Sequence, residues 1–282
     1  MIPIYADTNK GYAAYHQFAE ARKLAVTSLF YTIQGEGPFV GVPALFVRLA
    51  GCNLGAKVEC PWCDADFRFD NAKALSISEM VDQARVLLDY KEEDAETRSR
   101  KGLLVWTGGE PLLQWETLIP TMLQLSQDAG IVCHQYETNG VLLTREHLEA
   151  AVELSLFMDA DIKFVISPKV IGGKYRPLPE FLREDVFDDL LTLKYVVSAD
   201  PSSPYHTLPP LEEFRNLDVL VSGQTEYGPN DTLAQPGRPV CLFDLSRDAL
   251  KQTAANYAYA AQLALKHGLR TSYQTHLLAA VE

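Results

Sequence analysis

The sequence lacks any run of about 20 apolar residues, so we expect no membrane-spanning helix. The N-terminal residues contain no basic stretch followed by an apolar run, which argues against a secretory signal. Lysine and arginine form no cluster, and the formal net charge is −12. A surface this acidic repels a phosphate backbone, so we expect no direct contact with nucleic acid.

Cysteine is scarce and unevenly placed. The chain has five cysteines, and Cys52, Cys60 and Cys63 fall within twelve residues. An odd number with this crowding argues against a disulfide framework and favours a reducing compartment. We therefore expect a cytoplasmic protein.

Short β-rich runs alternate with helical stretches, and no internal repeat interrupts them. This alternation predicts a mostly parallel sheet with right-handed crossovers, in which the chemistry lies at the carboxyl ends of the strands. The predicted strands are 42–51, 102–109, 131–140, 162–169, 191–198, 238–246 and 269–276. The predicted helices follow at 112–130, with a bend near Pro120, at 144–154 and from Ser246 to Gly268.

The domain prediction is one α/β domain over 26–282, preceded by a peripheral extension over 1–25. Residues 70–101 and 199–237 are polar or rich in proline and glycine. We interpret both segments as insertions or loops.

Three thiols are one short of the usual closed tetrahedral zinc site, and no nearby histidine supplies the fourth ligand. An open three-thiolate site suits a [4Fe–4S] cluster with one iron left for another ligand. Structural zinc and three unligated core cysteines are the alternatives. Cys133 and Cys241, the remaining two cysteines, are predicted to be core thiols.

An aromatic residue before the last cysteine, Trp62, and the sequence TGGEP at 107–111 resemble the radical S-adenosylmethionine (SAM) superfamily. The usual loop of that superfamily has three residues between the first two cysteines, and here there are seven. The resemblance implies a partial, TIM-like barrel in which SAM occupies the open iron.

A longer match is more specific. Residues 28–54, SLFYTIQGEGPFVGVPALFVRLAGCNL, resemble the start of the 7-carboxy-7-deazaguanine synthase family. WCDADF, TGGEPLLQ, ETNG, SPK, LKYVV and SYQTH follow in the family's order, up to residue 276. The family, which is known for altered spacing of its first two cysteines, forms a deazapurine of the queuosine type.

The resemblance implies two sets of binding residues. The SAM ligands would be Trp62, Gly108, Gly109, Glu110, Thr138, Asn139, Ser167 and Lys169. The substrate ligands would be Gln34, Gly35, Glu36, Arg48, Thr107 and His276.

Each assignment has a structural alternative. Gly108 to Glu110 could form only a tight turn with a capping carboxylate, and Asn139–Gly140 could be an ordinary turn. Gln34 to Gly37 could be a surface hairpin, although apolar residues flank it. Arg48 alternates with Phe46 along a predicted strand and needs an anion if that face is interior, or only water if the strand is an edge.

The substrate implied by the resemblance is 6-carboxy-5,6,7,8-tetrahydropterin, which would become 7-carboxy-7-deazaguanine with loss of ammonia. A flavodoxin-like protein would supply an electron, SAM would be re-formed in each turnover, and the enzyme would be a homodimer. The family associates Mg²⁺ with a threonine after the third cysteine, where this chain has Ala65. Asp64, Asp66, substrate or water could hold the ion instead, so Mg²⁺ dependence stays open.

Other functions remain as alternatives. A radical SAM enzyme could act on another small heterocycle or activate a glycyl-radical protein, and a zinc or cluster module could have no enzymatic activity. A glycyl-radical activase has no use for the QGEG sequence at 34–37.

Overall fold

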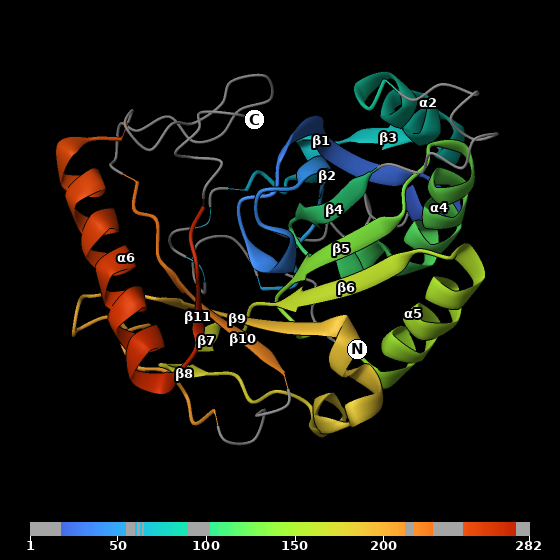
Figure 1. Cartoon of the computed structure of the whole chain (residues 1–282). Helices are drawn as coiled ribbons and strands as arrows, with labels where there is room; N and C mark the ends of the chain where they lie inside the picture. The colour runs from blue at the N-terminus through green and yellow to red at the C-terminus, as the bar shows by residue number, and fades with distance from the viewer. Residues whose placement is uncertain are drawn as a thin grey trace. The chain divides into compact units, whose positions relative to one another are not determined.

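The computed structural model describes residues 18–54, 60, 63, 65–89, 102–211, 217–227 and 245–274. The chain divides into two compact units (Figure 1). The first unit comprises residues 1–32, 43–58 and 65–163, and the second comprises residues 33–42, 59–64 and 164–282.

The first unit is a layer of strands covered by helices. Its strand order is β5-β4-β2-β1-β3, in which β4 pairs in parallel with both β2 and β5, and β3 pairs antiparallel with β1. Its strands are β1 (Leu24–Ile33), β2 (Pro43–Leu49), β3 (Lys73–Leu75), β4 (Leu103–Gly108), β5 (Cys133–Thr138) and the start of β6 (Asp161–Ile166). Its helices are η2 (Phe69–Asn71), α2 (Ile77–Leu87), η3 (Pro111–Gln114), α4 (Trp115–Asp128) and α5 (Arg145–Met158).

The second unit contains the end of β6 and has the strand order β11-β10-β9-β6, with all three pairings parallel. Its remaining strands are β7 (Val170–Ile171), β8 (Lys174–Tyr175), β9 (Leu191–Val197), β10 (Asp218–Gly223) and β11 (Arg270–Ser272). Its helices are η1 (Gly37–Phe39), η4 (Glu180–Arg183), η5 (Asp185–Leu190) and α6 (Arg247–His267). Figure 1 shows α6 alongside β10 and β11, both of which it contacts.

Over the described residues the strands amount to a mostly parallel α/β sheet of nine strands that is not closed. The prediction of a mostly parallel, incomplete α/β barrel is therefore confirmed. Among the described residues, none of the helices has the length and apolarity needed to cross a bilayer.

Most predicted elements form close to their expected positions. The predicted helix boundaries of α6 are confirmed, because Ser246 caps Ala249 N and Gly268 ends the helix with φ +67°. Pro120 lies inside α4, which continues through it as one helix. The predicted strand 238–246 lies mainly outside the described residues.

Two segments interpreted as loops contain regular structure. In 70–101 the structure forms β3 and α2, and in 199–237 it forms β10. The N-terminus of α2 is a capping box: Ser76 Oγ accepts from Glu79 N, and the Glu79 carboxylate accepts from Ser76 N. A Ser-x-x-Glu spacing before an amphipathic stretch is a recognised helix start, so this correction was available in the sequence. Whether either segment is an insertion stays a prediction.

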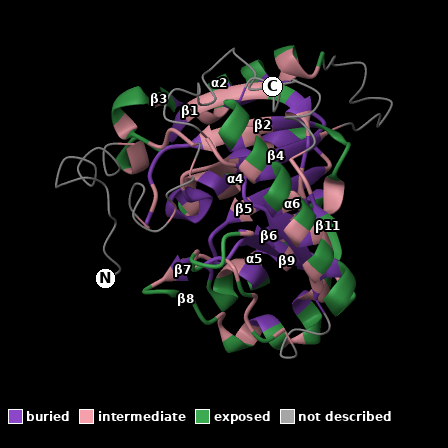
Figure 2. Ribbon diagram, turned by 90° about the vertical axis from the view of Figure 1, so that its left-hand side faces the viewer, coloured by how far each residue is buried: buried purple, intermediate pink, exposed green. Residues whose placement is uncertain are grey.

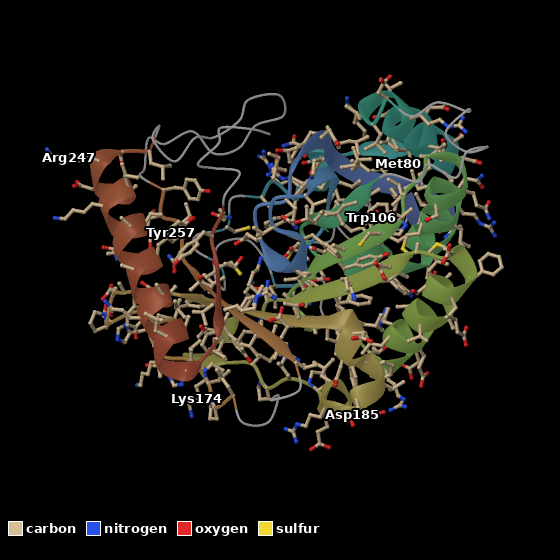
Figure 3. The ribbon with its side chains drawn as sticks, in the orientation of Figure 1. Met80, Trp106, Lys174, Asp185, Arg247 and Tyr257 are labelled. Atoms are coloured by element: carbon tan, nitrogen blue, oxygen red, sulfur yellow. The ribbon has the colours of Figure 1, made fainter. Side chains whose placement is uncertain are left out.

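The core of the first unit lies between its strands and helices. Trp106 of β4 and Tyr136 of β5 are fully buried and stack at 6.3 Å between ring centroids. Figure 2 shows that the strands are largely buried whereas the helices carry many of the exposed residues, and Figure 3 labels Trp106.

A buried histidine belongs to this layer. His134 accepts a hydrogen bond from Trp106 Nε1 at its Nδ1 atom (3.3 Å), which leaves Nε2–H to donate to Ser126 Oγ (3.0 Å). Burial lowers the pKa of His134 to about 3. The neutral imidazole is therefore the form that packs, and protonation opposes folding.

This burial predicts a specific acid sensitivity. The folded pKa lies below the ordinary value of about 6.5, so the stabilisation is complete above pH 6.5 and is lost as the pH falls toward 3. Between pH 7 and pH 5 the wild type should lose about 2 kcal/mol more unfolding free energy than His134→Gln. Denaturant titrations at both pH values measure this difference, and parallel losses would contradict it. An NMR titration of the wild-type imidazole gives the same test if the variant does not fold.

Candidate functional site

The carboxyl ends of β2 and β4 are joined by direct backbone contacts. Gly109 N donates to Leu49 O (2.9 Å), and Glu110 N donates to Gly51 O (2.8 Å). A Cβ atom on Gly109 would lie 1.7 Å from Gly51 O, and one on Gly108 would lie 2.4 Å from Leu49 N. The two glycines are therefore needed for the approach of the loop after β2, in addition to any ligand that they bind.

Gln114, the last residue of TGGEPLLQ, also stabilises the end of β2 through side-chain hydrogen bonds. Its amide accepts from Ala25 N and donates to Ala25 O and Ala50 O, at 2.9 to 3.2 Å. This buried side chain connects β1 with the residue that precedes Gly51. The family motif thus contains a residue with a structural role, Gln114, in addition to the predicted ligands.

Glu110 is fully buried, and its carboxylate accepts three hydrogen bonds. Leu112 N (3.1 Å) and Thr138 Oγ1 (2.7 Å) donate to Oε1, and Asn139 N (2.9 Å) donates to Oε2. The capping role that we had set against a ligand role is thus present, because the Leu112 contact caps η3. A role toward SAM stays a prediction.

The loops after β2 and β5 meet through two asparagines. Asn139 Nδ2 donates to Asn53 Oδ1 (2.7 Å), and Asn139 Oδ1 accepts from Val141 N (2.9 Å). Asn53 follows Cys52 directly and is itself buried. The turn at Asn139–Gly140 is therefore real and also contacts the cysteine loop.

Arg48 lies on a strand inside the sheet, since β2 has β1 on one side and β4 on the other. The alternative of an edge-strand arginine is therefore wrong. Arg48 and its β4 partner Thr107 are half-buried, and the guanidinium lies 4.9 Å from the centre of the Phe30 ring, which stacks on Phe46. The two predicted substrate ligands of this strand pair are thus neighbours on one face.

The same face continues onto β5. Gln135, which pairs with Val105 of β4, is fully buried, and its Nε2 donates to Glu137 Oε1 (2.6 Å). Gln135 Oε1 has no hydrogen-bond partner in the described part of the chain. Sequence reasoning quoted Glu137 only as part of ETNG and missed Gln135; alternation along β5 would have grouped both with Arg48 and Thr107.

The QGEG loop is an ordered part of the second unit. Gln34 N donates to Val42 O and Gly41 N donates to Gln34 O, both at 2.8 Å, which closes the loop on itself. Glu36 N donates to Gln34 Oε1 (3.1 Å). Gln34 is buried and Gly35 is also buried, so the loop is not an exposed hairpin.

Glu36 carries a half-buried charge that interacts with residues of β9 and β10. Lys194 Nζ lies 3.0 Å from Glu36 Oε2, and Ser222 Oγ donates to Oε1 (3.3 Å). The side chains are only 9% and 17% exposed, for Lys194 and Glu36 respectively. Burial raises the pKa of Tyr257, labelled in Figure 3, and the charge of Glu36 contributes to the shift. The sequence LKYVV alone does not indicate that Lys194 faces the QGEG loop.

The remaining SAM candidates follow β6. Lys169 Nζ donates to Ser167 Oγ (2.7 Å), and Ser167 is buried. An ammonium next to a hydroxyl suits a carboxylate or a ribose hydroxyl, so both residues stay candidates. Trp62, Asp64, Cys241 and His276 lie outside the described residues.

The carboxylate of Asp66 is bound by two neighbouring side chains. Its carboxylate accepts from Arg68 Nε (2.9 Å), from Arg68 Nη2 (3.0 Å) and from Asn71 Nδ2 (2.5 Å). The Arg68 guanidinium is the main reason that the pKa of Asp66 falls to about 2. With both oxygens engaged by its neighbours, Asp66 is a poor candidate for the Mg²⁺ ligand that Ala65 does not supply.

The cysteines divide between the units. Cys52 belongs to the first unit, Cys60 and Cys63 belong to the second, and Cys63 N donates to Cys60 O (3.0 Å). All three are half-buried, and the described residues contain no disulfide to any of them. Within the part of the chain that the structure describes, no group of three or more cysteine, histidine, aspartate or glutamate side chains is arranged to hold a metal ion.

By its chemistry, this donor set fits an iron–sulfur cluster. Thiols supply the soft ligands, and Asn53 beside Cys52 has a buried amide nitrogen with no partner among the described residues, which a bound group could satisfy. Cys133 is buried in β5, and burial raises the pKa of its thiol to about 12, as expected of a core cysteine. The assignment of Cys52, Cys60 and Cys63 as the cluster ligands stays a prediction.

The ion pair between Glu36 and Lys194 predicts that removing one charge destabilises the fold more than removing both. Lys194→Met leaves the Glu36 carboxylate buried without its ammonium and should cost about 3 kcal/mol of unfolding free energy. The double variant Glu36→Gln with Lys194→Met removes both charges and should recover most of this loss. Denaturant unfolding of the wild type, of Glu36→Gln, of Lys194→Met and of the double variant measures the coupling. A double variant as unstable as the sum of its two single variants would contradict the pairing.

Comparison with known proteins identifies the family. A search against protein-family models finds no match. The 7-carboxy-7-deazaguanine synthase of Rickettsia prowazekii (strain Madrid E) is 30% identical over 263 residues, which cover 93% of this chain and 91% of that protein. The enzyme of the same name from Rhodospirillum rubrum is 31% identical over 270 residues, which cover 91% and 92% of the two chains.

Among solved structures, the crystal structure of QueE from Escherichia coli aligns with 92% of this chain and 97% of its own, at 17% identity and a TM-score of 0.48. The sequence relatives carry the assignment, because the identity extends over nearly the whole of both chains. The chain belongs to the 7-carboxy-7-deazaguanine synthase family.

Proposed function

We propose that this protein converts 6-carboxy-5,6,7,8-tetrahydropterin to 7-carboxy-7-deazaguanine with loss of ammonia, as a radical SAM lyase of deazapurine biosynthesis. The observation that carries the proposal is family membership over 93% of the chain. Loss of ammonia accounts for the whole difference between substrate and product, so the reaction needs no net oxidant. A flavodoxin-like reductant and a homodimeric state complete the proposal.

Cys52, Cys60 and Cys63 would hold a [4Fe–4S] cluster, and Glu110, Thr138, Asn139, Ser167 and Lys169 would surround SAM together with Trp62 and the two glycines of TGGEP. When bound, the cluster and SAM supply the radical chemistry that removes a hydrogen atom from the substrate. The chain's own residues bind the substrate, orient it and exclude water.

The substrate carboxylate is assigned to Arg48. A guanidinium on an interior strand, half-buried against Phe30, is desolvated enough to favour an anion. Its planar donors match a carboxylate with two parallel hydrogen bonds. Thr107, opposite Arg48 on β4, adds a hydroxyl on the same face.

The pterin edge is assigned to the QGEG loop, with His276 as a further substrate ligand. Glu36 is held ionised by Lys194, so it can accept from the amino and ring N–H groups of a pterin. The Gln34 amide is held in place by Glu36 N and lies beside it. The same acceptors would also suit the guanine-like product, which has the same N–H groups.

The test of the proposed reaction is an anaerobic incubation of the reconstituted full chain with SAM, a strong reductant and the carboxylated tetrahydropterin. Mass analysis should find the deazaguanine acid together with released ammonia. Unchanged substrate, with SAM still cleaved to methionine and 5′-deoxyadenosine, would leave a radical SAM enzyme that acts on a different heterocycle. A colourless one-zinc protein would favour a non-enzymatic module.

The carboxylate assignment predicts a selective loss. Arg48→Ala should raise the substrate KM at least about tenfold, which corresponds to about 1.4 kcal/mol, while iron content stays at the wild-type level. Arg48→Lys should recover only part of the affinity, because an ammonium lacks the paired donors.

Arg85→Ala is the matched control, since Arg85 Nε donates to Asp128 O (2.6 Å) and serves packing between α2 and α4. Its substrate KM should equal that of the wild type. An Arg48→Ala protein with wild-type KM and turnover would remove Arg48 from the substrate site.

A further inference from the structure

Asn53 has a buried amide nitrogen whose orientation is set by its neighbours. Val141 N donates to Asn139 Oδ1, so Asn139 Nδ2 is the atom left to donate. Asn139 Nδ2 donates to Asn53 Oδ1, so Asn53 must present its Nδ2 elsewhere. An amide flip of either side chain would place two donors or two acceptors against each other.

Among the residues that the structure describes, this nitrogen has no hydrogen-bond partner, and Asn53 is only 4% exposed. Leaving a buried donor unsatisfied costs about 1 to 3 kcal/mol, and folded proteins contain few such groups. A group that binds at this position would repay that cost.

The surroundings of Asn53 are rigid. Asn139 is tied to the fully buried Glu110 through its backbone N–H, and Thr138 donates to the same carboxylate. Gly51, two residues before Asn53, accepts from Glu110 N. The donor is therefore held in place before any ligand arrives, which lowers the entropic cost of binding.

We propose that Asn53 Nδ2 is a hydrogen-bond donor to an acceptor of the bound cluster–SAM group, either a sulfur of the cluster held by Cys52 or the carboxylate of SAM. Both acceptors carry negative charge, and both suit an uncharged N–H₂ next to a cluster cysteine. This inference rests on the proposed function, because it requires the cluster and SAM to bind.

The experiment compares Asn53→Ala and Asn53→Asp with the wild type, all as cluster-loaded full chains. Asn53→Asp keeps an oxygen for Asn139 Nδ2 and removes the donor, but it also adds a negative charge, so the effect of the lost donor is the change that the uncharged Asn53→Ala shares with it. Asn256→Asp is the control, because it makes the same substitution at a buried asparagine whose Nδ2 already donates to Gln224 O and Glu226 Oε1. The readouts are the reduction potential of the cluster before SAM is added and the Kd of SAM.

The two acceptors give different results. If the acceptor is a cluster sulfur, both Asn53 variants shift the potential to more negative values with little change in the Kd of SAM, since hydrogen bonds to sulfur raise cluster potentials. If it is the SAM carboxylate, the potential is unchanged and the Kd of SAM rises about tenfold, or about 1.4 kcal/mol. Either result supports the proposal.

An Asn53→Ala chain whose potential and Kd both equal those of the wild type would overturn the proposal. Failure of the wild-type chain itself to take up iron and bind SAM would instead count against the proposed function. Thermal unfolding of each variant before loading checks that the chain is folded, and the uncharged Asn53→Leu replaces Asn53→Ala if that variant does not fold.

Discussion

The fully buried carboxylate of Glu110 is the interaction on which the first unit's loops depend. It stands after β4 and accepts hydrogen bonds from Leu112 in η3 and from Thr138 and Asn139 after β5. A carboxylate without water needs such donors, because an unpaired buried charge is costly. Its own N–H reaches back to Gly51, so one residue connects the ends of β2, β4 and β5. The glycine at position 109 allows this approach, since any side chain there would collide with Gly51.

In the second unit a carboxylate is stabilised by an ion pair. The Glu36 carboxylate lies on a loop, and a buried loop has to satisfy polar groups that a strand would satisfy through its ladder. Lys194 and Ser222, from two adjacent strands, supply the donors. A carboxylate held in this way stays ionised and keeps acceptor capacity for a ligand. Preorganised polar groups of this kind are the protein's main contribution when a cofactor carries the chemistry.

Much of this architecture was predictable from the sequence. Long apolar runs such as PALFVRL and LLVWTG predicted β2 and β4, and serine and glycine at its two ends delimited α6. The short strands β3, β7 and β8 were not predicted, because two or three residues carry no detectable periodicity. Helix α2 was missed because polar composition was given more weight than its capping box.

Site residues were predictable as types but not as contacts. Motif resemblance selected Glu110, Asn139 and Glu36, yet it did not reveal that Asn53 is their neighbour or that Lys194 partners Glu36. These contacts join residues 86 and 158 positions apart, and a single sequence holds no signal for such pairs. Asn53 follows Cys52 in the sequence, but only the unsatisfied amide nitrogen in the structure indicates that it could bind a ligand.

The central claim is that Cys52, Cys60 and Cys63 together leave one iron of a cluster open for SAM. Iron and sulfide analysis of the anaerobically reconstituted full chain, followed by electron paramagnetic resonance with and without SAM, tests it most directly. The account predicts about four irons and four sulfides per chain and a spectrum that changes when SAM is added. One zinc per chain without sulfide, or a cluster spectrum indifferent to SAM, would contradict it.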